Sequence, residues 1–240
     1  MSADWGRRAV AEFIGAFALV FIGIGAIAAG GDLTAVALAH GLAIAVMASA
    51  VGHISGAHFN PAVTFGFLVT RRIVPALAAI YIAAQLAGAV AASLLLKWLF
   101  PGNPLANGVP RVQVISSTEA AVLEAILTFF LVWVIFATAA DSRGSFKSIA
   151  GLGIGLAITM DIFAGGRLTG AAMNPARAFG PQLVGGHWAN AWVWYIGPLV
   201  GGALAALLYE WLYLRPLAPA PVGTAESGVL EPRPGDAAAS

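Results

Sequence analysis

The sequence predicts an all-α membrane protein with six transmembrane helices and two re-entrant half-helices arranged as an inverted repeat. Three observations support this prediction. Of the 240 residues, 60% are hydrophobic and 10% are charged, and apolar runs of about 20 residues recur along the chain. The triplet Asn-Pro-Ala occurs twice inside apolar sequence, at 60–62 and at 174–176. The two halves of the chain also repeat one another.

The apolar runs predict where the chain crosses the membrane. The expected spans are residues 9–29, 33–52, 76–98, 119–140, 148–166 and 191–213. They form one domain, 1–213, with repeats at about 9–98 and 119–213. The first run follows two arginines as in a signal peptide, but it lacks a cleavage-like site and is kept as mature structure. Residues 214–240 are rich in Pro, Ala and Gly and are expected to be a disordered cytoplasmic tail.

The distribution of basic residues predicts the orientation. Cytoplasmic loops are enriched in Lys and Arg, and the larger group here belongs to the side that holds both termini. That group is Arg7, Arg8, Arg71, Arg72, Arg143, Lys147 and Arg215, against Lys97, Arg111, Arg167 and Arg177 on the other side. Both termini are therefore expected in the cytoplasm. Ala-rich spans and short loops favour the cell (inner) membrane, with a vacuolar membrane as the alternative.

Charge and cysteine content exclude several function classes. The net charge of +1 gives no sign of a nucleic-acid partner. The sequence contains no cysteine, which excludes disulfides, thiolate metal sites and thiol catalysis. We expect no cofactor and no bound metal.

The repeat has an offset of 114 residues, which separates Asn60 from Asn174. At the same offset, residues 41–44 (Gly-Leu-Ala-Ile) match 155–158, and 55–57 (Ser-Gly-Ala) match 169–171 (Thr-Gly-Ala). Each half holds three spans, an odd number, so the second half crosses the membrane in the opposite sense. The loops that carry the two triplets then enter from opposite faces.

Each triplet predicts a helix that starts inside the membrane. Asn60 and Asn174 are strong N-cap residues, and Pro61 and Pro175 suit the first helical position; Ala62 and Ala176 follow them. A helix N-terminus carries about half a positive charge and unpaired N–H groups, which lipid cannot solvate. Two such ends facing each other suit a wet passage that neutral molecules cross and cations do not.

These features resemble the aquaporin (major intrinsic protein) family over about residues 9–213. The most specific segments are 55–64 (SGAHFNPAVT) and 173–177 (MNPAR), while 137–141, 171–181 and 195–198 look closest to the tonoplast intrinsic proteins. The resemblance implies a passive channel, not an enzyme, that passes water, ammonia and other small neutral solutes and excludes protons and ions. It also implies a homotetramer in the lipid bilayer with one pore in each subunit.

The resemblance also assigns site residues. By their spacing from the two triplets, the narrow selectivity filter would consist of His40, Ile162, Ala171 and Arg177. Strict water channels usually carry Phe at the place of His40 and His at the place of Ile162, so this filter departs from theirs and matches the tonoplast type.

Three further polar residues receive expected roles. Glu12 and Glu124 lie early in the first span of each half and are expected to accept N–H groups from the non-helical loop of their own half. His58 is expected to line the pore or to anchor its loop. The sequence leaves open whether Asp161 pairs with Arg167 or borders the mouth.

Three alternatives remain open. A glycerol facilitator would usually carry Asp and a basic residue where this chain has Ala178 and Gln182. A coupled transporter would need an ion or proton site near the midplane, and neither triplet has an adjacent acid. An intramembrane enzyme would need a nucleophile with a base, but the pair Ser55 and His58 is not reproduced in the second repeat.

Overall fold

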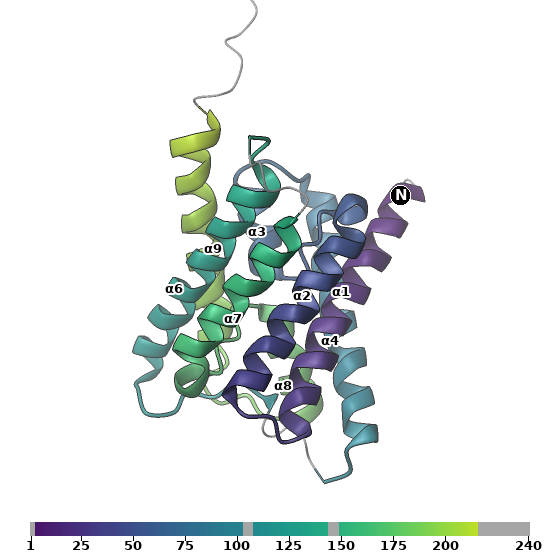
Figure 1. The fold of residues 1–240 in the computed structure, drawn as a ribbon, viewed down its shortest axis with the longest axis vertical. Coiled ribbons are helices and arrows are strands. Elements are labelled where there is room, and N and C mark those ends of the chain that lie inside the picture. The colour runs from purple at the N-terminus through teal and green to yellow at the C-terminus, as the bar shows by residue number, and fades with distance from the viewer. Residues whose placement is uncertain (1–2, 103–107, 144–148, 216–240) are drawn as a thin grey trace, which may run out of the picture.

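The computed structural model describes residues 3–102, 108–143 and 149–215. The predicted tail, 214–240, lies outside the described residues from 216 onward. The described residues form helices joined by loops and contain no strand, which confirms the predicted all-α class (Figure 1).

Six helices in the described part of the chain are long and apolar enough to span a membrane, as predicted. They are α1 (Ala3–Ala28), α2 (Leu33–Ser55), α4 (Pro75–Leu99), α6 (Ser117–Ile135), α7 (Ala150–Thr169) and α9 (Val193–Tyr209). Two π-helical turns, η1 (Phe136–Ala140) and η3 (Glu210–Leu214), continue α6 and α9.

The main difference from the predicted spans is at the start of α1, which begins six residues before the apolar run. Its first turns are polar, and Asp4 and Arg8 form an i, i+4 ion pair of 2.7 Å on the helix surface. Apolar periodicity marks the part of a helix that lies in lipid, and a polar extension into water does not change that signal.

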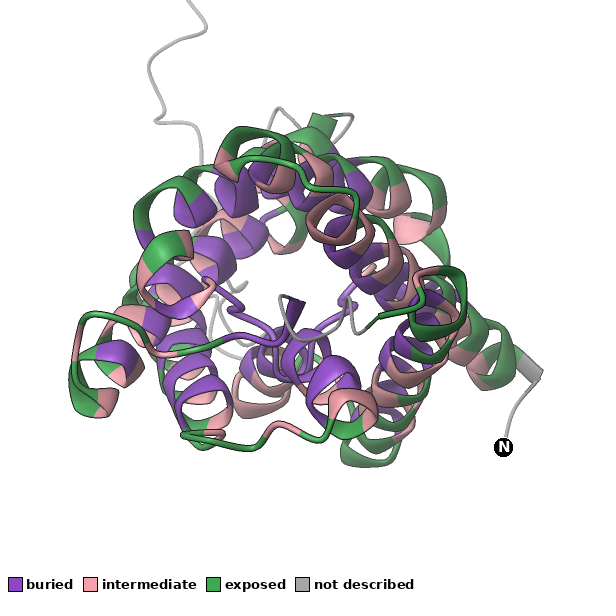
Figure 2. Cartoon of the chain, turned by 90° about the horizontal axis from the view of Figure 1, so that it is seen from below, coloured by how far each residue is buried: buried purple, intermediate pink, exposed green. Residues whose placement is uncertain are grey.

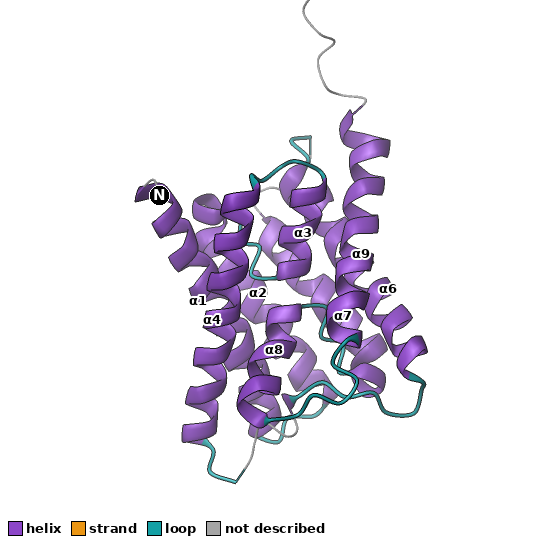
Figure 3. Ribbon diagram, turned by 180° about the vertical axis from the view of Figure 1, so that it is seen from behind, coloured by secondary structure: helices purple, strands orange, loops and turns teal. Residues whose placement is uncertain are grey.

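Two short helices lie within the bundle: α3 (Pro61–Val69) and α8 (Pro175–Gly185). Each begins directly after an extended Asn that caps it, with φ of −155° at Asn60 and −147° at Asn174. Figure 3 shows α3 in one half of the bundle and α8 in the other, with the loops that precede them running inward. The re-entrant half-helices predicted from the triplets are present.

The long helices surround these two short ones. Packed pairs are α1 with α4, α6 with α9, and α2 with α7, so the first two pairs correspond through the repeat. The α2 and α7 helices meet where repeat-equivalent Gly41 and Gly155 face each other, and a side-chain carbon on Gly155 would overlap the Gly41 carbonyl oxygen. Figure 1 places both ends of the described chain at the same end of the bundle.

The outside of the bundle is apolar, unlike the surface of a water-soluble protein. Figure 2 shows buried residues facing the centre of the ring of helices and exposed residues on its outside. Large apolar side chains such as Leu42, Val46 and Leu204 are more than half exposed there, whereas Glu12 and Glu124 are fully buried. An apolar outer surface of this extent suits contact with lipid.

Asp141 connects the end of η1 to α9 at the end of the bundle that holds the termini. Its carboxylate accepts hydrogen bonds from Arg143 Nη2 (2.7 Å) and the Tyr209 hydroxyl (3.1 Å). The hydrogen bonds from Arg143 hold the pKa of Asp141 well below its usual range. The carboxylate therefore stays ionised at neutral pH and keeps the two elements joined.

Candidate functional site

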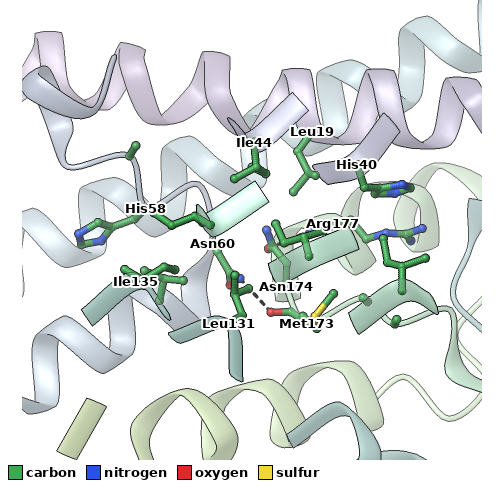
Figure 4. Close-up of a pocket in the computed structure, with 17 residues that line it drawn as sticks. Leu19, His40, Ile44, His58, Asn60, Leu131, Ile135, Met173, Asn174 and Arg177 are labelled. Atoms are coloured by element: carbon green, nitrogen blue, oxygen red, sulfur yellow. Dashed lines mark hydrogen bonds between the residues drawn. The ribbon is translucent and has the colours of Figure 1, made fainter. Parts of the chain in front are cut away.

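The N-termini of α3 and α8 meet at the centre of the bundle, where each Asn braces the opposite half. Asn60 Nδ2 donates to the Met173 carbonyl at 2.8 Å, and Asn174 Nδ2 donates to the Phe59 carbonyl at 2.9 Å. The Oδ1 of each Asn accepts from its own half-helix, from Ala62 N in α3 and from Ala176 N in α8. Figure 4 shows Asn60 and Asn174 side by side in the middle of a cavity.

This arrangement leaves hydrogen-bond donors for a molecule in the cavity. A side-chain amide has two N–H groups, and the contacts across the bundle occupy one on each Asn. Both Asn residues line the cavity, so the second N–H of each can bind a passing acceptor such as a water oxygen. The two helix dipoles also direct positive potential at this point, which opposes a cation.

The loops before the half-helices adopt a strained conformation that the repeat preserves. Positive φ occurs at Ala57 and Phe59 in the first loop and at the equivalent Ala171 and Met173 in the second, with values of 42–53°. Side chains rarely adopt this region, so surrounding contacts must hold it.

Two buried glutamates supply those contacts. The Glu12 carboxylate accepts from Ser55 Oγ (2.6 Å), His58 N (2.9 Å) and Phe59 N (2.6 Å). In the second half, Glu124 accepts from Thr169 Oγ1 (2.6 Å), Ala172 N (2.9 Å) and Met173 N (2.7 Å). Each glutamate thus satisfies the polar backbone of the loop in its own half.

Three further residues, which sequence reasoning missed, support the same loops. The Tyr81 hydroxyl donates to the Ser55 carbonyl at 2.6 Å, and Trp194 Nε1 donates to the equivalent Thr169 carbonyl at 3.0 Å. Gln85 Nε2, fully buried in α4, donates to Glu12 and to Thr64. A glutamine inside an apolar span could have indicated a role for Gln85. The repeat did not single it out, because the equivalent position in the second half is Leu199.

Three cavities lie end to end through the bundle. The central one has a volume of about 30 Å³, room for about two water molecules. It shares His40, Ile162 and Arg177 with a cavity of about 550 Å³ at the end of the bundle away from the termini, called the outer cavity. It shares Ala57 and Ile154 with a cavity of about 540 Å³ at the end that holds the termini, called the inner mouth. The shared lining residues make the three cavities one narrow path between two wider mouths.

Polar and apolar groups both line the central cavity. The polar side chains are those of His40, His58, Asn60, Asn174 and Arg177. Much of the remaining lining is a wall of branched apolar side chains from α2, α3, α6 and α7, namely Ile44, Val63, Leu131, Ile135, Ile154, Ile158 and Ile162. A wall without hydrogen-bonding groups leaves a transported molecule few partners that could retain it.

The four residues expected in the filter are brought together at the outer end of this cavity. Arg177 Nη1 donates to the Gly108 carbonyl at 2.8 Å. The residue is 3% exposed, and its guanidinium has no carboxylate within ion-pair distance in the described residues. His40 Nδ1 lies 2.8 Å from the Val36 carbonyl oxygen, an acceptor only, so Nδ1 carries the proton. Ile162 and Ala171 complete the lining, and Figure 4 shows the His40 and Arg177 side chains close together.

His58 lines the inner part of the central cavity and is also anchored there. Its Nδ1 lies 3.1 Å from Thr64 Oγ1, and its ring packs against Phe67 and Tyr81. The two roles left open for this residue are therefore compatible.

Asp161 neither pairs with Arg167 nor borders a mouth of the path, the two possibilities that the sequence left open. It is 2% exposed, lines none of the three cavities, and forms no ion pair with Arg167 within the described residues. Its Oδ2 has no hydrogen-bond partner in that part of the chain. His53, by contrast, lines the inner mouth, although nothing in its sequence context indicated a site.

Comparisons with known proteins agree with this architecture. The chain is 44% identical over 222 residues to "Aquaporin TIP4-4" of Zea mays, covering 87% of each protein. It is 44% identical over 226 residues to "Probable aquaporin TIP3-2" of Arabidopsis thaliana, covering 87% of this chain and 84% of that protein. The crystal structure of the aquaglyceroporin from Plasmodium falciparum superposes with a TM-score of 0.80 at 28% identity, over 89% of this chain and 98% of that one.

The family model described as "Major intrinsic protein" matches residues 1–209, which include all six spans up to α9 and both half-helices. Together with the paired Asn-Pro-Ala half-helices that meet in a continuous path, this match shows that the chain belongs to the major intrinsic protein family, the family of the aquaporins.

Proposed function

We propose that this protein, a passive membrane channel for water, also passes ammonia and other small neutral solutes through the filter of His40, Ile162, Ala171 and Arg177. The observation that carries the proposal is that His40, Ile162 and Arg177 line both the narrow central cavity and the outer one, while Ala171 lines the central one. Every molecule that follows the path passes His40, Ile162 and Arg177. Residues 1–213 act as one channel domain.

The composition of the filter supports the passage of ammonia. Ammonia is less polar than water and must leave its hydration shell to enter a narrow site. Ile162 and Ala171 have no hydrogen-bonding groups in their side chains. A molecule less polar than water therefore passes this filter more easily than it would pass a filter with a second polar side chain. The names of the two plant relatives, both TIP aquaporins, favour the same subclass.

Charge in the path supports the exclusion of cations and protons. The Arg177 guanidinium and the two half-helix N-termini all present positive potential to the path. No acidic side chain of the described residues lines any of the three cavities. A coupled transporter would need such a group to bind its driving ion, so the path favours a channel.

We further propose that the channel is a homotetramer in the cell (inner) membrane, with a vacuolar membrane as the alternative and both termini in the cytoplasm. The apolar outer faces of the helices supply surface for lipid and for neighbouring copies. The molar mass of the detergent-solubilised protein, measured by light scattering with the detergent subtracted, tests the stoichiometry. A mass equal to one chain of 24.5 kDa contradicts it.

The experiment that tests ammonia passage compares the parent with Ile162→His in reconstituted vesicles. The substitution adds a bulky polar group to the apolar wall, so internal alkalinisation driven by ammonia should fall by about tenfold, while osmotic shrinkage falls by less. Glycerol and urea are tested in the same vesicles, because rapid glycerol flow would favour the glycerol facilitator. Absence of ammonia flow in the parent, or equal loss of both flows in the variant, contradicts the proposal.

A further inference from the structure

One face of α1 borders the path on both sides of the filter. Leu19 lines the central cavity and Ile27 lines the outer cavity. The residue midway between them at helical spacing is Gly23, because positions i, i+4 and i+8 share one face of a helix. Gly23 itself lines neither cavity, since another side chain lies over it.

That side chain is His40. A methyl group built on Gly23 would overlap three atoms of the imidazole, namely Nε2, Cδ2 and Cε1, far inside van der Waals contact. The ring cannot swing freely, because its Nδ1 is hydrogen-bonded to the Val36 carbonyl on α2 and the residue is 3% exposed. The imidazole therefore occupies the space that any side chain at position 23 would fill.

We propose that Gly23 is a specificity-determining positioning residue, which provides a recess for the His40 ring and thereby sets the width of the filter. The backbone of α1 borders the ring on one side, and the two cavities border it on the other. A side chain at position 23 therefore displaces the imidazole toward the path, in the direction of Ile162 and Arg177. The inference rests on the proposed filter role of His40.

Helix packing alone does not account for this glycine. Gly25 lies two residues further along the same helix, and a methyl group there would be 3.7 Å from Leu96 Cδ2, an ordinary contact. A Gly to Ala change in a helix usually stabilises it slightly when space permits. Gly25→Ala is therefore a matched control that alters the same helix without touching His40.

The experiment measures water, ammonia and urea permeabilities of reconstituted Gly23→Ala, Gly25→Ala and parent protein at equal reconstituted amounts. Gly23→Ala should lower ammonia permeability by about tenfold, the change produced by a barrier increase of about 1.4 kcal/mol, and water permeability by less. Gly25→Ala should match the parent in all three. Equal permeabilities in Gly23→Ala and Gly25→Ala overturn the inference.

A second pair of variants tests whether the effect acts through His40. In a His40→Ala background the ring is absent, so adding Gly23→Ala should leave every permeability unchanged within about twofold. A persistent loss in that background would assign Gly23 to general packing and overturn the inference. If the parent passes water but not ammonia, the ammonia proposal fails by itself, and the water permeabilities of the four variants still decide the role of Gly23.

Discussion

At the scale of single residues, the direction of the Arg177 side chain depends on a backbone carbonyl from a distant loop. Nη1 donates to the carbonyl of Gly108, and a methyl group at Gly108 would overlap Ile24 Cγ2. Gly108→Ala should shift this carbonyl and release the guanidinium, so we expect urea to enter about tenfold faster while water flow persists. Urea uptake into reconstituted vesicles measures this.

The control for that prediction shortens the opposing side chain. After Ile24→Ala only the Cβ of residue 24 remains near the new methyl group, at 3.3 Å, so Gly108→Ala combined with Ile24→Ala should recover much of the parent's urea exclusion. A double variant as leaky as Gly108→Ala would show that the Ile24 contact does not position the loop.

Ala171 offers a direct chemical test of the filter register. It lines the central cavity, and the sequence contains no cysteine, so mercurials should not block the parent channel. Ala171→Cys places a soft thiol ligand in the path, and we expect mercury to abolish most water flow and a reducing agent to restore it. The backbone φ of 42° strains Cys and Ala alike, so folding should be retained. If the Ala171→Cys variant is active and mercury does not block its water flow, Ala171 does not line the filter.

At the scale of elements, the sequence predicted the six spans and the two half-helices because their signals are local. The length of an apolar run indicates how much helix lies in lipid. The pair Asn60-Pro61 indicates a helix start, because Asn caps a helix and Pro has the φ of the first helical position. The π-helical turns after α6 and α9, and the support of Gln85 for the first loop, were not predicted. These depend on which distant groups meet after packing, and no short sequence pattern encodes that.

The close packing of α2 on α7 gives a prediction for stability. A methyl group on Gly155 would overlap the Gly41 carbonyl oxygen and lie 2.9 Å from Ala45 N, both on the facing helix. Gly155→Ala should therefore destabilise the protein by about 1–3 kcal/mol, the usual cost of overpacking. Thermal unfolding in detergent measures it.

Gly153 on the same helix is the control for this change. A methyl group there would be 3.8 Å from Thr138 Cγ2, so Gly153→Ala should leave the melting temperature unchanged or raise it slightly. If both variants melt like the parent, α2 and α7 can separate enough to accept the side chain, and the close glycine contact is not needed for stability.

At the scale of the whole molecule, the repeat builds a symmetric centre and asymmetric ends. The 114-residue offset relates the four filter positions to Ala48, Ala57, Val63 and Ile154, which line the opposite part of the path. These equivalents are all apolar, whereas the filter contains His40 and Arg177. The proposed filter therefore has no polar counterpart at the four equivalent positions of the path, while the two half-helix N-termini meet at its centre.

The paired half-helices lead to the last prediction, fast water flow without proton flow. Asn60 and Asn174 both donate toward the centre, so a water there accepts through its oxygen and directs its hydrogens away, which interrupts a continuous chain of proton transfer. The positive potential of both N-termini also opposes hydronium. Vesicles with the protein should shrink osmotically about tenfold faster than empty ones, yet hold an imposed pH gradient as long. Light scattering and an entrapped pH dye measure the two quantities in one preparation, and a proton leak that rises with the amount of protein would contradict this mechanism.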